Sequence, residues 1–160
     1  MTGSPDAIDS AIGLSPTDSL HALRALRPEF VSGSEDCRAA VLTPAADLGL
    51  SPALRMAVAR RVAATAEMPR LLAGYPAPAD PALAALAEGE TPEDPALAAL
   101  ARHADMIART PRAASAAHLA ALQEAGYTVP QIIALSELLA YVCYQIRVVA
   151  GLSLLKGDAA

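Results

Sequence analysis

The chain has 160 residues, enough for a single domain with a sizeable hydrophobic core. Its net charge of −5, with the 12 Lys and Arg residues scattered along the sequence, excludes the basic surface that a nucleic-acid partner requires. Hydrophobic residues make up 54 % of the chain, mostly Ala and Leu, while aromatic residues reach only 3 %. Because Ala and Leu favour helices over strands, the composition predicts an all-α fold.

The N-terminal sequence MTGSPDAIDSAIGLS is acidic and polar. It lacks the positive and apolar segments of a secretory signal, so we expect a cytoplasmic protein. Further along, Asp18 or Ser19 is expected to cap a helix that Pro28 ends, and a second helical block, weakened by a glycine, follows it. We expect residues 1–49 to form an N-terminal helical extension of a single domain that spans residues 1–160.

The next helix is marked by Ser51 as N-cap and Pro52 at the first helical position. Four residues at helical spacing form one stripe along this helix: Leu54, Val58, Val62 and Thr65. Three arginines lie away from that stripe: Arg55, Arg60 and Arg61. Residues 76–95 are rich in proline and are expected to form a loop-rich connector with one short helix. The sequence DPALAAL occurs at Asp80 and again at Asp94, where Asp caps a helix and Pro opens it.

The second half of the sequence is more regular. We expect a helix over residues 94–109 and another that follows Ser115 and ends at Gly126. The most apolar segment then covers residues 129–151, and we expect it to be the central and most buried helix. Its charged side chains would be costly at the centre of a bilayer, so we favour a core helix over a membrane span.

The sequence contains no Gly-rich phosphate loop, no metal-spaced cluster of His and carboxylate residues, and no nucleophile elbow. Cys37 and Cys143 match neither a Cys-x-x-Cys pair nor the spacing of metal ligands. We expect both to be free thiols, with Cys143 filling part of the core. The sequence therefore predicts neither a metal nor a cofactor.

Polar side chains share one face of the last helix, at Glu137, Tyr141, Tyr144 and Gln145. They form either a pocket wall with Glu137 as acid or base, or a hydrogen-bonded seam between helices or subunits. His103 is expected on an exposed or half-buried face, where it can exchange protons with a substrate or serve a structural role. Arg147 lies in an apolar run, so we expect it to pair with a carboxylate of another helix or of a second subunit.

An ordered set of motifs covers residues 103–155. A helix that ends in Pro leads to the pattern LxALxxAGxxxxxIxxL, and an aromatic-rich helix follows with an Arg before a GL end. The residues concerned are Leu119, Leu122, Ala125, Gly126, Ile132, Leu135, Arg147, Gly151 and Leu152. This order resembles the carboxymuconolactone decarboxylase-like proteins, the superfamily of alkylhydroperoxidase D (AhpD). The resemblance extends over residues 50–155 and implies an AhpD-like helical bundle.

In that superfamily, the segment that corresponds to SPALRMAVARRVAATAEMPRLLAGY holds a redox site made of a Glu, a Cys-x-x-Cys pair and a His. The resemblance puts Met68 and Leu71 at the two cysteine positions. It puts Met56 at the Glu position and Tyr75 at the His position. Thiol peroxidase chemistry needs a thiolate and a second, resolving thiol, so the resemblance implies a degenerate redox site here.

Three hypotheses for function follow. The first is a ligand-binding or partner-binding homo-oligomer without thiol peroxidase activity. The second is a non-redox enzyme of decarboxylase or lactone type, with acid and base groups from Glu137, His103 and Tyr141. The third, which is weaker, is peroxidase-related activity from Cys143 or Cys37. Because related proteins associate and the last helix is apolar, we expect a dimer or a larger oligomer, with no nucleic-acid or membrane partner.

Overall fold

A computed structural model describes residues 6–157. The regular secondary structure of this part of the chain consists of helices joined by loops, with no strand. The helices are α1 (Ala7–Ile12), α2 (Ser19–Ala25), α3 (Pro28–Leu42), α4 (Pro52–Ala64), α5 (Pro69–Ala73), α6 (Pro81–Ala87), α7 (Pro95–Arg109), α8 (Ala116–Glu124) and α9 (Val129–Lys156), with a 3-10 turn at Pro111–Ala113. The all-α prediction is confirmed. Residues 1–5 of the expected N-terminal extension, and residues 158–160, lie outside the described range.

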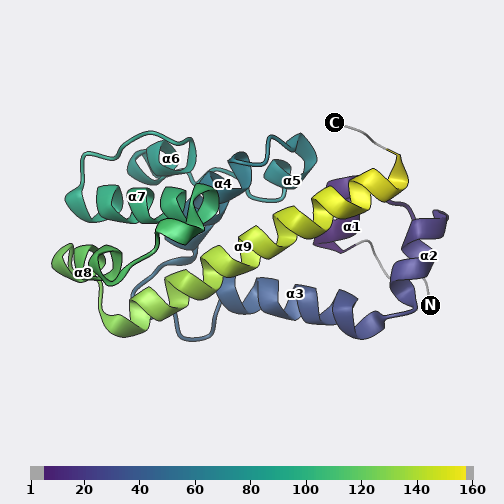
Figure 1. The fold of residues 1–160 in the computed structure, drawn as a ribbon, viewed down its shortest axis with the longest axis horizontal. Helices are drawn as coiled ribbons and strands as arrows, with labels where there is room; N and C mark the ends of the chain where they lie inside the picture. The colour runs from purple at the N-terminus through teal and green to yellow at the C-terminus, as the bar shows by residue number, and fades with distance from the viewer. Residues whose placement is uncertain (1–5, 158–160) are drawn as a thin grey trace.

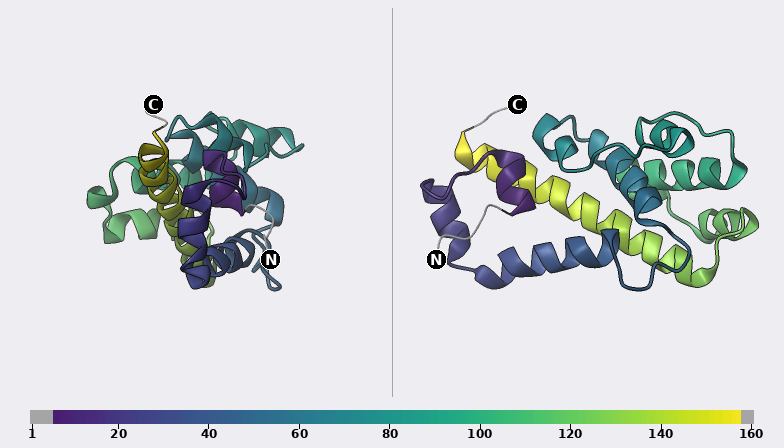
Figure 2. Two further views of the ribbon diagram at one scale, coloured as in Figure 1. Left: turned by 90° about the vertical axis from the view of Figure 1, so that its right-hand side faces the viewer. Right: turned by 180° about the vertical axis from the view of Figure 1, so that it is seen from behind.

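Helix α9 crosses the whole molecule, and the other helices are arranged around it (Figure 1). Helix α3 lies on one side of α9, and α4 to α7 lie on the other. Helices α1 and α2 are near the C-terminal end of α9, and α8 is near its N-terminal end, as the reverse view in Figure 2 also shows. In the described residues, α9 alone is long and apolar enough to cross a membrane, but 39 % of that apolar stretch is buried against other helices.

Local capping signals set most helix boundaries. The Ser51 hydroxyl accepts a hydrogen bond from the backbone N–H of Leu54, and the Asp94 carboxylate accepts one from Leu97. A capping box of Thr128 with the side chain of a glutamine opens α9. These predicted boundaries are confirmed, and α6 is the short helix expected between residues 76 and 95.

The end of α9 differs from the prediction. The helix continues through Gly151 to Lys156 and ends at Gly157, whose φ of +87° is the left-handed C-cap conformation. A single glycine inside a helix costs only about 1 kcal/mol, which the packing of a long helix can offset. Gly151 therefore does not stop α9.

By the share of its residues that are buried, α9 is not the most buried helix, so the prediction that residues 129–151 form the most buried helix is wrong. Four of the six residues of α1 and seven of the 13 residues of α4 are buried, compared with nine of the 28 residues of α9. Helix α4 packs against α3, α5, α6, α7 and α9, whereas long stretches of α9 have a side without a covering helix.

Two of the α4 arginines lie in the core, a position that the sequence did not indicate. Arg55 is 2 % exposed, and its guanidinium donates to three backbone carbonyls: Leu50 (Nε, 2.9 Å), Val41 (Nη1, 3.0 Å) and Asp47 (Nη2, 3.0 Å). Burial lowers the pKa of Arg55, and the negative charges of Asp47 and Glu137 oppose this shift. The guanidinium thus joins the end of α3 and the following loop to α4.

Arg61 joins α4 to α7 and to the end of α6. Its guanidinium forms a two-bond salt bridge with Asp105 of α7, at 2.8 and 2.7 Å, and Nη1 donates to the carbonyls of Leu86 and Glu90. Its neighbour Arg60 donates to the carbonyl of Tyr75 and pairs with a glutamate after α6. Through these arginines α4 is linked to α6, to α7 and to the chain after α5.

We predict that Arg55→Met lowers the free energy of unfolding by about 2 to 4 kcal/mol, because up to three carbonyls lose their donor while the methionine retains most of the apolar stem. Arg55→Lys should also destabilise, since one ammonium cannot reach three divergent carbonyls. Urea unfolding monitored by circular dichroism measures both. Arg102→Met, on the exposed face of α7, is the matched control and should change stability by no more than about 0.5 kcal/mol.

Candidate functional site

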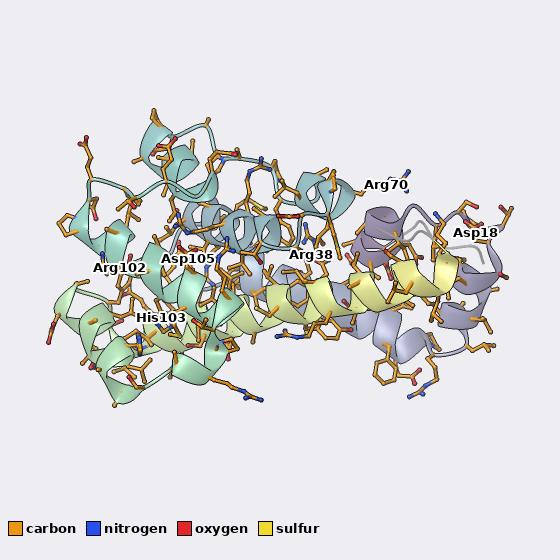
Figure 3. All side chains as sticks on the ribbon, turned by 45° about the horizontal axis from the view of Figure 1, so that its top comes forward. Asp18, Arg38, Arg70, Arg102, His103 and Asp105 are labelled. Atoms are coloured by element: carbon orange, nitrogen blue, oxygen red, sulfur yellow. The ribbon has the colours of Figure 1, made fainter. Side chains whose placement is uncertain are left out.

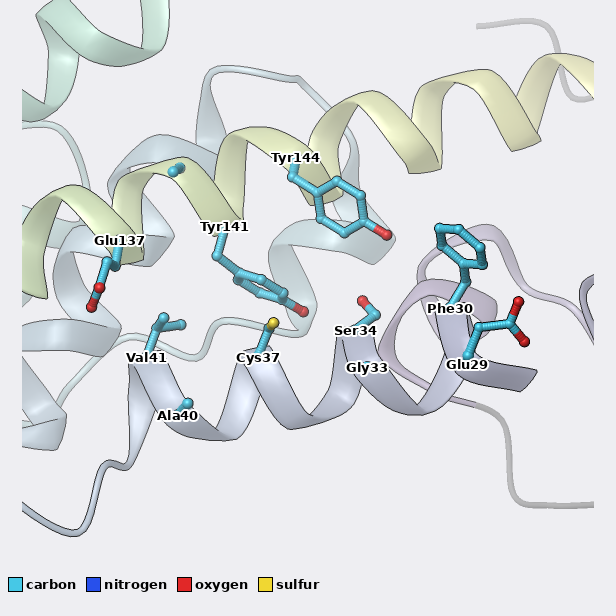
Figure 4. Close-up of a pocket in the computed structure, with 11 residues that line it drawn as sticks. Glu29, Phe30, Gly33, Ser34, Cys37, Ala40, Val41, Glu137, Tyr141 and Tyr144 are labelled. Carbon is cyan, nitrogen blue, oxygen red and sulfur yellow. The ribbon is translucent and has the colours of Figure 1, made fainter. Parts of the chain in front are cut away.

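An apolar groove runs between α3 and α9 and encloses about 750 Å³ (Figure 4). Both helices contribute residues at helical spacing, so that one stripe of each faces the groove. The lining residues are Glu29, Phe30, Gly33, Ser34, Cys37, Ala40 and Val41 from α3, and Glu137, Ala140, Tyr141 and Tyr144 from α9. Small side chains on α3 face the two tyrosines of α9, and this difference in size leaves the space between the helices.

The polar face that the sequence predicts on α9 is divided between two environments. Glu137, Tyr141 and Tyr144 line the groove, with Glu137 exposed. Gln145 is buried elsewhere and accepts a hydrogen bond of 2.5 Å from the Tyr75 hydroxyl. The pocket-wall interpretation thus fits the first three residues, and the polar-seam interpretation fits Gln145.

Buried polar atoms without hydrogen-bond partners gather at the groove. Ser34 and Tyr141 are 5 % and 6 % exposed, and their hydroxyls lie close to each other but neither has a partner in hydrogen-bond geometry. Arg38, one turn after Ser34, also has a buried Nη1 without a partner, but this residue lines a different cavity, beside α1 and α5. Burial raises the pKa of Tyr141, and the nearby Ser34 hydroxyl and Arg38 guanidinium oppose this shift. Since buried polar groups are nearly always hydrogen-bonded, this concentration indicates a binding site.

Other groups at the groove define its chemical character. Glu29 lies near one end and Glu137 near the other, with the exposed thiol of Cys37 between them (Figure 4). Both cysteines are free, as predicted, and Cys143 is only half-buried against the core. The groove therefore has apolar walls, two hydroxyls without partners, and negative charge at its ends.

His103 does not join Glu137 and Tyr141. The expected exposed or half-buried position is wrong, because His103 is 6 % exposed on α7, where α8 packs against that helix. Its Nδ1 is buried without a hydrogen-bond partner, and it is absent from the groove lining. Burial lowers the pKa of His103, with a further contribution from the nearby His118. The three predicted acid and base residues therefore do not face one cavity.

Arg147 also departs from its predicted role. It is exposed, and its Nη1 donates to the carbonyl of Cys143 one turn earlier in α9, at 2.9 Å. No carboxylate in the described chain pairs with it. A residue in an apolar sequence run can still lie on an uncovered face, and α9 has such a face here.

The four positions that the resemblance assigns to a redox site are occupied by packing residues. Tyr75 and Leu71 are buried, Met56 is half-buried on α4, and Met68 directly precedes α5. Burial raises the pKa of Tyr75, and the guanidinium of Arg38 lies 4.8 Å from the centre of its ring. These side chains offer no thiol, no imidazole and no carboxylate.

Comparison with models of protein families, with characterised proteins and with solved structures finds no match to this chain. The residues of the groove are therefore the main indication of what this protein does. The sequence pattern identified Tyr141 and Glu137 of this groove but not Ser34. The available signal was the spacing of Gly33, Ser34 and Cys37, which is the spacing of one helical face.

We predict that protein stability falls as the pH decreases from 7 to 5, partly because of His103. Its pKa is below 6.5 in the folded protein, so the unfolded chain binds more protons in this window and folding weakens as pH falls. One such group contributes at most about 1.4 kcal/mol per pH unit. Urea unfolding at several pH values should give a shallower slope for His103→Leu. An unchanged slope in His103→Leu would refute the assignment.

Proposed function

We propose that this chain is a carboxymuconolactone decarboxylase-like protein without thiol redox chemistry, and that it binds a small neutral ligand in the α3–α9 groove, in the cytoplasm. The observation that carries the proposal is the pair of buried hydroxyls without partners, Ser34 and Tyr141, at an otherwise apolar groove. Pockets for small molecules have this composition, with apolar walls and a few directed polar groups.

The charges at the groove favour a neutral ligand over an anionic one. Glu29 and Glu137 would repel a carboxylate that lies between them. The Ser34 and Tyr141 hydroxyls can donate to a carbonyl or accept from a hydroxyl of the ligand. An aromatic lactone or ketone satisfies both conditions, because its ring contacts Phe30 and the tyrosines while its carbonyl accepts a hydrogen bond.

The acid–base enzyme is a second candidate, with less support. Glu137 and Tyr141 share the groove, so a carboxylate and a phenol could act on a bound lactone. His103 cannot take part from its buried place beside α8. This candidate therefore needs Glu137 as its base, and Glu137→Gln should then abolish turnover of any lactone while leaving binding intact.

Self-association through exposed apolar residues is part of the proposal. Leu154 and Leu155 at the end of α9 are 72 % and 76 % exposed, and Leu23 of the neighbouring α2 and Leu26, directly after α2, are also exposed. A second copy of the chain covering such a face would remove this apolar surface from water. Light scattering at micromolar concentration should give at least a dimer mass, and a monomer mass would count against it.

Coumarin, a neutral aromatic lactone, should bind the groove and raise the melting temperature. Tyr141→Phe and Ser34→Ala should each weaken binding about two- to tenfold, the effect of one neutral hydrogen bond. Fluorescence titration measures the affinity. Tyr127→Phe, whose hydroxyl donates to a backbone carbonyl away from the groove, is the matched control.

Coumarin-3-carboxylate tests the charge argument on the same scaffold. It should bind the wild-type groove more weakly than coumarin does, and Glu137→Gln should narrow that difference. If no aromatic lactone saturates the protein, or if the Tyr141 and Ser34 variants bind coumarin as the wild type does, the proposed ligand class is wrong.

The protein should also show no multiple-turnover reduction of an alkyl hydroperoxide with a dithiol reductant. The degenerate positions carry no thiol, and Cys37 and Cys143 are both free, so the fold contains no formed disulfide pair of the kind that such turnover cycles through. The assay compares the wild type with Cys37→Ser and Cys143→Ser. Turnover that disappears in either variant would establish a relocated thiol peroxidase and overturn this part of the proposal.

A further inference from the structure

A second cavity lies beside α1, α3 and α5, and encloses about 490 Å³. Its lining residues are Ala7, Ser10, Ala11, Arg38, Arg70, Leu71, Ala73, Gly74, Tyr75 and Gln145. Most of these side chains are small and apolar. Arg38 and Arg70, both labelled in Figure 3, are the two charged residues of the lining.

Neither of the two arginines that line this cavity has a carboxylate partner. In the described chain, Arg24, Arg27, Arg60 and Arg61 all form salt bridges. No described carboxylate lies within 4.0 Å of Arg38 or Arg70, and the cavity lining contains no Asp or Glu. The cavity is thus a local positive site in a protein with a net charge of −5.

Arg38 is held in position before any ligand binds. Its Nη2 donates to the carbonyl of Gly74 at 2.7 Å, and its guanidinium lies 4.8 Å from the centre of the Tyr75 ring. Its Nη1 is buried and has no acceptor. Glu35, one turn earlier in α3, does not pair with Arg38 and instead accepts a hydrogen bond from the Ala7 backbone N–H at 2.9 Å. Arg38 therefore has a fixed donor without an acceptor.

Arg70 lies against the end of α1. Gly13 ends that helix with a φ of +63°, and a Cβ at this position would overlap the Arg70 guanidinium. The glycine therefore serves both the left-handed turn and the close approach of Arg70. The approach brings a second guanidinium to a cavity that Arg38 also lines, on elements far apart in the sequence.

We infer that this cavity binds the oxyanion of a small organic acid, with Arg38 as the inner donor and Arg70 as the outer one. Guanidinium groups recognise carboxylates and phosphates through directed, charge-assisted hydrogen bonds. The alanine-rich walls favour a short apolar body attached to the oxyanion. This site is separate from the α3–α9 groove, whose acidic ends select a neutral molecule.

Hexanoate and inorganic phosphate, titrated by calorimetry at constant ionic strength with chloride as the balancing anion, test the inference. Hexanoate should saturate the wild type. Arg70→Gln and Arg38→Lys should each weaken it about tenfold or more, the effect of losing one hydrogen bond to a charged group. Arg102→Gln removes the same charge from an exposed site on α7 and should leave the affinity unchanged.

Arg70→Gln should bind coumarin with the same affinity as the wild type, because Arg70 does not line the groove. Loss of hexanoate binding with unchanged coumarin binding would therefore distinguish this site from the groove. If the wild type binds no coumarin, the groove proposal fails, and the hexanoate titration still tests this site. If phosphate binds more tightly than hexanoate, the result would still support an oxyanion site and would identify phosphoryl compounds as its class of ligand. Absence of saturable binding by both anions, or an equal loss in Arg102→Gln, would overturn the inference.

Discussion

The fold depends on guanidinium groups that leave water to bind backbone carbonyls around α4. With only 3 % aromatic residues, the protein cannot rely on large rings to hold many short helices together. Arg55 donates hydrogen bonds to three backbone carbonyls at the end of α3 and in the following loop. Arg61 binds Asp105 of α7 and two backbone carbonyls at and after the end of α6. A buried charge is costly unless such partners surround it, so these loops and α4 stabilise one another.

This arrangement has a direct consequence for the groove. Arg55 holds the end of α3 against α4, while the rest of α3 extends beside α9 on the other side of the molecule (Figure 1). The α3 residues that face α9 are small, and Tyr141 and Tyr144 do not fill the space between the two helices. The groove between the two helices thus stays open, and the unpartnered hydroxyls support the proposal that it is a binding site.

One turn of α3 contributes to both proposed sites. Ser34 faces the α3–α9 groove, and Arg38 lines the cavity beside α1 and α5. The groove has carboxylates at its ends, whereas the cavity has two guanidiniums, so we propose a neutral ligand for the groove and an anion for the cavity. Because Arg38 also lies near the Tyr141 hydroxyl, the two sites adjoin.

The sequence by itself determined the helical class and most helix ends, because the caps at Ser51, Asp94 and Thr128 act within a few residues of chain. It also placed Tyr141 and Glu137 on one helical face. Tertiary structure decided that His103 is buried, since α8 covers α7. It also decided that α9 keeps an open side and that Ser34, Arg38 and Tyr141 come together across two helices. Burial depends on which neighbour covers a face, and helical periodicity carries no information about that neighbour.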